Sequence, residues 1–453
     1  MNAEARLRPE HAVAGRTAPA SAALAGALIL GVVAAYSPKT ALEALLALAL
    51  VVVAVWRLDL AVAVFVVLTF PEHLPGAFGE GVTLAKPVGA VIALAWLAIV
   101  ASRRGAVPIL PRDCPALFWA AVGFLALGTT SVLWATGGSE TIYVLGRLAQ
   151  VALLAVIAYT AAGTRSGFRT ILWGYLAGSA ITSLYSIATG AYGQNGRLGT
   201  LFDPNYFAAI LVPAICVALF FAVGEGDRRS RTIAAGVALV DLAAFVLTQS
   251  RGGLVGLGVG LAAAVVLAGR ARPRVLALVL VLVAGGLGYY AVATPAHVLS
   301  GSSSGRAGEW RVAIRMFEHH PVGGVGLGNF TVVEPSYATE TVDLNRVGLI
   351  VNQPHRTHNT YLEVLAELGV PGLLLFLAVI YTATRAALGG LARLTLAEDP
   401  LELPARGLIA GAIGLFSAYI FISATWEKQL WLIFGLLGAI AVLVRERDEP
   451  ESS

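Results

Sequence analysis

The chain has 453 residues, of which 57% are hydrophobic and only 13% are charged. A soluble domain has roughly 25% charged residues, so this composition excludes a soluble globular protein and predicts a chain embedded in lipid. The formal net charge is +4, and the two cysteines, Cys114 and Cys216, both fall in or beside apolar segments. They provide neither a disulfide framework nor the spacing of metal ligands.

Fourteen apolar stretches are long enough, or nearly so, to cross a bilayer core of about 30 Å. In chain order they are 20–36, 40–56, 58–70, 83–101, 114–134, 142–162, 168–190, 204–224, 232–248, 252–268, 275–295, 366–390, 406–426 and 429–444. Each must be helical, because backbone groups in the hydrocarbon find no water to bond with. The region 40–70 also allows one broken or re-entrant element. The sequence therefore predicts an all-α integral membrane protein with about 12–14 transmembrane helices.

Arginine placement orients these spans, since cytoplasmic loops are enriched in Lys and Arg. If the N-terminus is cytoplasmic, the inner loops hold most of the arginines, whereas the outer loops at 135–141 and 426–428 are nearly free of them. This pattern predicts a cytoplasmic tail at 1–19, N-terminal transmembrane helices at 20–295, a large extracytoplasmic loop at 296–360, C-terminal transmembrane helices at 361–444 and a cytoplasmic tail at 445–453.

The extracytoplasmic loop is far longer than a connector between two helices needs to be. It contains the run GSSSG at 301–305, a stretch of helical character at 307–319 and the run PVGGVGLGNF at 321–330. We therefore expect short helices within it. The glycines of the last run permit close backbone approach, but the run lacks the strand–helix context of a dinucleotide fingerprint, so no such site is expected.

Several cations lie on the predicted outer side, where the charge bias makes them scarce. They are Arg197, Arg251, Arg306, Arg311, Arg315, His355, Arg356 and His358, with Lys86 and Arg147 near the outer ends of their spans. A single loop arginine is usually only solvated, and Lys86 can extend toward the headgroups. Arg147 and Asp241 are costly to bury inside spans, so they either face a cavity or pair with each other.

Arg251 is confined to the membrane surface by a tight turn between two spans. Ser250 precedes it and Gly252-Gly253 follows it. A planar guanidinium makes paired hydrogen bonds to phosphate oxygens, so Arg251 suits a diphosphate at headgroup depth. Arg197, on a neighbouring outer loop, offers a second group of the same kind.

His358 is a candidate general base, because histidine titrates near neutral pH and can take a proton from an attacking hydroxyl. The alternative is a structural role, in which His358 caps the helix that begins at Asn359. His355 is either its partner or only its neighbour. Two histidines without a third ligand do not make a metal site, so we expect no bound metal.

Four segments resemble the O-antigen ligase/polymerase superfamily. They are GRLGTLFDPNYFA at 196–208, TQSRGGLVGL at 248–257, HPVGGVGLGNF at 320–330 and HNTYLEVLAELGVPG at 358–372, in the family's order. The resemblance implies a helical, lipid-embedded and metal-independent inverting glycosyltransferase. Such enzymes pass a glycan from an undecaprenyl-diphosphate carrier to an acceptor hydroxyl at the outer face of the membrane.

The resemblance also implies roles for individual residues. Arg197 and Arg251 would clamp the diphosphate and neutralise the leaving group, and His358 would act at the acceptor hydroxyl as general base or orienting group. Arg306, in GRAGEW at 305–310, matches a family-like Arg…Trp pattern. The candidates for substrate binding are Arg306, His355, Arg147 and Lys86.

Asp203 is expected to shape its loop or to cap the helix that starts near Pro204, and no carboxylate base is apparent. The expected partners are an undecaprenyl-diphosphate-linked glycan donor, a lipid-, glycan- or protein-linked acceptor and the lipid bilayer, with no cofactor and no nucleic acid. The expected location is the bacterial cytoplasmic (inner) membrane, with the active site facing outward.

Two alternatives to a ligase stay open. One is a polysaccharide polymerase of the same family, which shares the motifs. The other is a transporter for a lipid-linked glycan, which should carry ionisable groups at mid-membrane between repeats. The cations here gather at one face, which favours an enzyme, and a non-catalytic scaffold would leave Arg197, Arg251 and His358 without a role.

Overall fold

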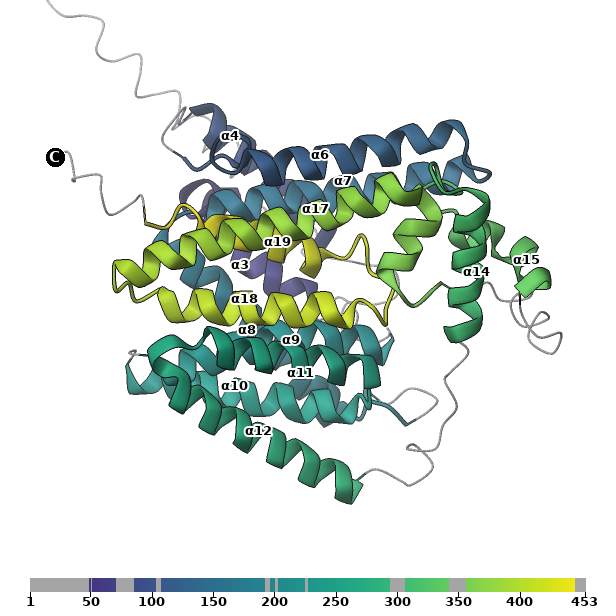
Figure 1. Cartoon of the computed structure of the whole chain (residues 1–453). Helices are drawn as coiled ribbons and strands as arrows, with labels where there is room; N and C mark the ends of the chain where they lie inside the picture. The colour runs from purple at the N-terminus through teal and green to yellow at the C-terminus, as the bar shows by residue number, and fades with distance from the viewer. Residues whose placement is uncertain are drawn as a thin grey trace, which may run out of the picture.

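The described part of the chain folds into a bundle of helices, most of which lie side by side (Figure 1). The computed structural model describes residues 49, 51–70, 85–102, 107–191, 196–199, 203–224, 227–293, 306–341 and 356–444. The expected span at 20–36 and the first half of that at 40–56 lie outside these residues. Every regular element in the described residues is a helix, which confirms the predicted all-α fold class.

Twelve helices occupy the places of predicted spans within the described residues. They are α3 (Leu58–Thr69), α4 (Ala85–Ser102), α6 (Pro115–Thr130), α7 (Gly138–Ala161), α8 (Arg165–Thr189), α9 (Pro204–Val223), α10 (Arg228–Leu247), α11 (Arg251–Leu267), α12 (Arg272–Ala293), α17 (Thr360–Leu396), α18 (Glu402–Ala418) and α19 (Lys428–Ile440). Three short elements join them: α5 (Leu110–Asp113), η2 (Ser131–Leu133) and η3 (Gly269–Ala271). The chain is therefore an all-α membrane protein.

Length and apolarity distinguish several of these helices as candidate membrane spans. Among the described residues, six helices are long and apolar enough to cross a membrane, namely α6 with η2, α7, α8, α9, α10 and α17. The consecutive helices α11 and α12 meet at an angle of 108° and would make a seventh if they form one broken span. Helices α3, α4 and α19 are shorter apolar helices.

Helix α9 runs through the middle of the bundle and is apolar all round, as a fully buried helix must be. It packs against α10, α11 and α18. Small residues let these helices approach closely. A Cβ built on Gly256 of α11 would lie 2.8 Å from the carbonyl oxygen of Gly414 on α18, so a side chain at this crossing would push the two helices apart.

The predicted large loop contains two described helices, α14 (Arg306–His319) and α15 (Phe330–Thr341), at one end of the bundle (Figure 1). Helix α17 breaks at Gly369, whose φ of 65° and ψ of −165° are not helical. The glycine-rich run packs against the segment before this break, where Val325 N donates to Ala366 O at 3.0 Å and Gly326 N donates to Glu367 O at 2.8 Å. Its glycines thus permit close approach to the backbone of α17.

Candidate functional site

The N-termini of α9, α11 and α17 converge at the end of the bundle where α14 lies (Figure 1). A polar residue caps each of them. The side chain of Asp203 accepts from Asn205 N at α9, Ser250 Oγ accepts from Gly253 N at α11, and Asn359 Oδ1 accepts from Tyr361 N at α17. These short polar residues fix where each helix begins, and each cap lies within a few residues of a predicted site residue.

Arg197 is partly buried and held in place by two hydrogen bonds. Its Nε donates to Thr248 O at 2.8 Å, and its Nη2 donates to Asn205 Oδ1 at 2.9 Å. Burial lowers the pKa of Arg197, Asp203 opposes this change, and the positive charges of Arg306 and Arg251 lower the pKa further. The structure therefore brings three of the predicted arginines close enough for their charges to act on one of them.

Arg251 is the first residue of α11 and is exposed. The hydroxyl of Ser250, which is buried, donates to Asn205 Oδ1 at 2.8 Å, so the start of α11 is tied to the same amide that holds Arg197. The preceding residue, Gln249, has a φ of 50°, which is uncommon for a residue other than glycine. This turn fixes the backbone from which Arg251 extends.

An apolar cavity of about 410 Å³ opens beside Arg251, between α10, α11 and α12. Its polar lining consists of Gln249 and Ser250, in the turn before α11, and Arg251, the first residue of that helix. The remaining lining residues are apolar or glycine: Ile215, Leu242, Phe245, Val246, Leu254, Leu257, Gly258, Leu261, Leu282 and Val283. The cavity thus has one charged end and an otherwise hydrophobic wall, a shape that suits an amphipathic ligand.

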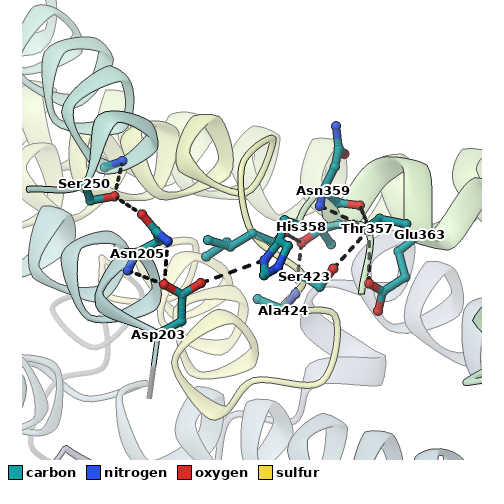
Figure 2. A network of polar contacts seen from close by, with 12 residues as sticks. Asp203, Asn205, Ser250, Thr357, His358, Asn359, Glu363, Ser423 and Ala424 are labelled. Atoms are coloured by element: carbon teal, nitrogen blue, oxygen red, sulfur yellow. Dashed lines mark hydrogen bonds and ion pairs between the residues drawn. The ribbon is translucent and has the colours of Figure 1, made fainter. Parts of the chain in front are cut away.

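His358 lies between the Asp203–Asn205–Ser250 group and the start of α17 (Figure 2). Its φ is 49°, so its backbone is left-handed, and the buried Thr357 before it is bonded to Asn359 N at 3.1 Å and to Glu363 Oε2 at 3.2 Å. The cap of α17 is the side chain of Asn359. The alternative that His358 caps this helix is therefore wrong, and its ring is left to face Asp203.

Asp203 caps α9, which was one of the two roles expected for it. It also faces His358. Its Oδ1 accepts from Asn205 N at 2.9 Å and from Asn205 Nδ2, while its Oδ2 lies 3.8 Å from His358 Nδ1 (Figure 2). The expected cap is thus confirmed, and the carboxylate also stands beside the histidine. Asn205, whose Oδ1 also accepts from Arg197 and Ser250, joins the histidine and the arginines into one network.

Sequence analysis missed Asp203, Asn205 and Thr357 as members of the site. A signal for the first two was present, because an Asp followed by Pro at the start of an apolar run marks a helix N-terminus. The position of this N-terminus beside His358 is a tertiary contact, which no local pattern reports.

The other predicted residues are distributed more widely. Arg306 is the first residue of α14 and belongs to the charged group around Arg197. Arg147 instead lies over the ring of Trp426, 5.8 Å from its centroid, and Arg356 lies 4.2 Å from the same centroid. Arg147 and Arg356 therefore lie together at Trp426, whereas Arg197 is bonded to Asn205.

Two predicted substrate-binding residues receive no structural account. His355 lies outside the described residues, and Lys86 is the second residue of α4 with its side chain outside them. The alternative pairing of Arg147 with Asp241 is wrong, because the buried carboxylate of Asp241 accepts hydrogen bonds from Ser179 Oγ and Ser183 Oγ, both at 2.7 Å.

Arg315 pairs with Glu318 at 3.3 Å, as a solvated loop cation does. Within the described ranges, no three His, Cys, Asp or Glu side chains come together in a way that could hold a metal ion. The arginine side chains near Asn205 make this place suited to bind an anionic group beside a histidine.

Residues 234–377 match the family described as O-antigen ligase. This segment runs from α10 to the part of α17 beyond its break, and it includes Arg251, Arg306 and His358. Arg197 and Asp203 precede it. No curated protein matches the chain. The resemblance predicted from the motifs is confirmed over residues 234–377, the segment that matches the O-antigen ligase family.

Proposed function

We propose that this protein is a glycosyltransferase that transfers a glycan from an undecaprenyl-diphosphate carrier to an acceptor hydroxyl at the outer face of the bacterial cytoplasmic membrane. The family match supports a ligase- or polymerase-like activity. The observation that carries the finer proposal is the network in which Asn205 accepts from Arg197 and from Ser250, the residue before Arg251, and donates to Asp203, which faces His358. This arrangement offers an anion site and a proton acceptor at one place.

The arginines would bind the diphosphate of the donor. Guanidinium groups pair with phosphate oxygens in a bidentate manner and stay charged at any physiological pH. The helix N-termini of α9 and α11 add positive potential at the same place. When the bond between the sugar and the diphosphate breaks, negative charge grows on the leaving diphosphate, and these fixed charges stabilise it without a metal ion.

His358 would act on the acceptor. The acceptor hydroxyl attacks the anomeric carbon from the side opposite the leaving group, which inverts the configuration. One carbon–oxygen bond forms as the bond to the diphosphate breaks, and the hydroxyl proton passes to the imidazole. The activated diphosphate already supplies the driving force, so positioning, charge neutralisation and one proton acceptor suffice.

The cavity beside Arg251 would hold the isoprenoid tail of the donor. Its volume of about 410 Å³ and apolar lining suit a hydrocarbon chain, and its charged end coincides with the proposed diphosphate site. A tail in the cavity would place the diphosphate at Arg251. A sugar nucleotide has no hydrocarbon tail to contact this apolar lining.

Narrowing this cavity tests the donor assignment. Leu254→Trp is expected to raise the KM for a donor with a full-length prenyl tail by about tenfold, because the larger ring takes space from the tail. The KM for a donor with a short tail should change little. Val266→Trp, at an exposed position of the same helix outside the cavity, is the matched control. Equal effects on both donors would remove the tail assignment.

We also propose that α14 and α15 lie outside the membrane, in the loop at 296–360. Val332→Cys on α15 is expected to react with an impermeant maleimide in intact cells, and Leu396→Cys at the far end of α17 is expected to react only after lysis. Both positions are exposed, at 44% and 85% respectively. The native Cys114 and Cys216 are buried and give little background. The reverse labelling pattern would invert the proposed topology.

A further inference from the structure

The two carboxylate oxygens of Asp203 make different contacts. Oδ1 is engaged within its own turn, where it accepts from the backbone and side-chain nitrogens of Asn205. Oδ2 points to His358 Nδ1 across 3.8 Å (Figure 2). Helix capping needs only Oδ1, so the cap does not account for the second contact.

We propose that Asp203 is a positioning residue for His358: it holds the imidazole so that Nδ1 faces the carboxylate and Nε2 faces the acceptor hydroxyl. This inference rests on the proposed function and goes beyond it by assigning a partner to the proposed base. As the hydroxyl proton moves to Nε2, the ring becomes positively charged, and the carboxylate beside Nδ1 stabilises that charge. The proton stays on the imidazole.

The backbone around His358 supports such a role. A left-handed residue with a large side chain is held only where its surroundings impose that conformation. Here the buried Thr357 on one side and the cap residue Asn359 on the other are tied to each other and to α17. The backbone thus directs the ring toward Asp203, and the carboxylate then fixes its orientation.

Asn205 connects this pair to the proposed diphosphate site. Its side-chain nitrogen donates to Asp203, and its oxygen accepts from Arg197 Nη2 at 2.9 Å and Ser250 Oγ at 2.8 Å. The buried amide therefore sets the distance between the histidine pair and the arginine site. Because one amide holds both the proposed base and the proposed leaving-group site, the acceptor and the donor stay aligned.

The decisive variant is Asp203→Asn, because asparagine caps a helix as well as aspartate does and only the charge is lost. The other charged residues that act on this end of the bundle, Arg197, Arg251 and Arg306, remain, and Glu363 stays bonded to Thr357. Asp227→Asn is the matched control, since Asp227 also caps a helix, through a 3.2 Å bond from Ser230 N at α10. Asp203→Glu retains the charge and tests for rescue.

The first readout is the titration of His358 by NMR in purified protein with isotope-labelled histidine, assigned by comparison with His358→Gln. A nearby carboxylate favours the protonated ring, so the titration midpoint of His358 should be lower in Asp203→Asn than in wild type. It should not move in Asp227→Asn. This measurement needs no substrate, so it is independent of the proposed activity.

The second readout is transfer of glycan. Asp203→Asn should lower kcat by about 10- to 100-fold with little change in the KM for the donor, and the acidic limb of its pH profile should move to lower pH. Asp203→Glu should recover part of the rate. An unchanged midpoint and an unchanged kcat would overturn the positioning role. If the midpoint shifts in Asp203→Asn but the wild-type protein transfers no glycan, the proposed function is overturned, and with it any catalytic role for the pair.

Discussion

Replacement of Arg251 by glutamine is expected to lower the rate of glycan transfer by about 100- to 1,000-fold, the usual effect of removing one group that stabilises transition-state charge. Arg251→Lys should also be impaired, by about tenfold or more, because a point charge cannot replace a planar fork on a diphosphate. Both rates are measured with purified protein and a diphosphate-linked donor.

The fold should survive these changes, because Ser250 caps α11 and Arg251 itself is exposed. Arg311→Gln, on the exposed face of α14, removes a cation outside the proposed site and serves as the control. If Arg251→Gln transferred glycan at the wild-type rate while Arg311→Gln did the same, no diphosphate clamp would exist at this turn.

Replacement of His358 is expected to lower kcat by about 100- to 10,000-fold, the range for loss of a general acid–base group. Two variants separate chemistry from backbone effects. Asparagine tolerates the left-handed conformation that His358 adopts, whereas alanine does not favour it. Equal losses in His358→Asn and His358→Ala, with donor binding retained, would assign the loss to the missing imidazole.

His320→Ala is the control for this pair of variants. His320 is an exposed histidine of the same region, and its Nε2 lies 3.2 Å from the hydroxyl of Tyr337, away from the Asp203 network. A loss in His320→Ala as large as that in His358→Asn would mean that the region is sensitive to any histidine change. A full rate in His358→Asn would exclude the ring as the base.

Much of the fold follows from local patterns. The apolar run predicted at 204–224 became α9 at Pro204–Val223, and the run at 252–268 became α11 at Arg251–Leu267. Both runs follow a cap residue, Asp203 and Ser250, and lipid requires such runs to be helical. The family segment was also predictable, because its motifs are short and contiguous.

The contacts within the site were not predictable in the same way. Asp203 meets His358, and Arg147 meets Trp426, between segments far apart in the chain. Sequence reasoning identified the arginines by their unusual side of the membrane, but a charge bias cannot choose a partner. The sequence therefore allowed Arg147 as an ion-pair partner for Asp241. In the structure, two serines on α8 donate hydrogen bonds to that carboxylate instead.

The break in α17 was missed for a related reason. The apolar stretch around Gly369 predicts one helix although Pro371 interrupts it, and the run at 321–330 docks on the non-helical backbone at the break. Built on Gly369, a Cβ would lie 2.4 Å from Val322 O, so this position needs glycine. The break separates the turn that carries His358 from the long helix behind it.

The most direct test of the central claim is transfer from an undecaprenyl-diphosphate glycan by the purified protein in detergent, with a chelator present and the products sized. Wild type is compared with His358→Asn across a panel of lipid, glycan and protein acceptors. We predict that wild type makes either longer carrier-linked chains, as a polymerase does, or a glycan on a new acceptor, as a ligase does, and that the variant makes neither. No transfer by wild type, together with movement of the donor across liposomes, would contradict the enzyme and support a transporter.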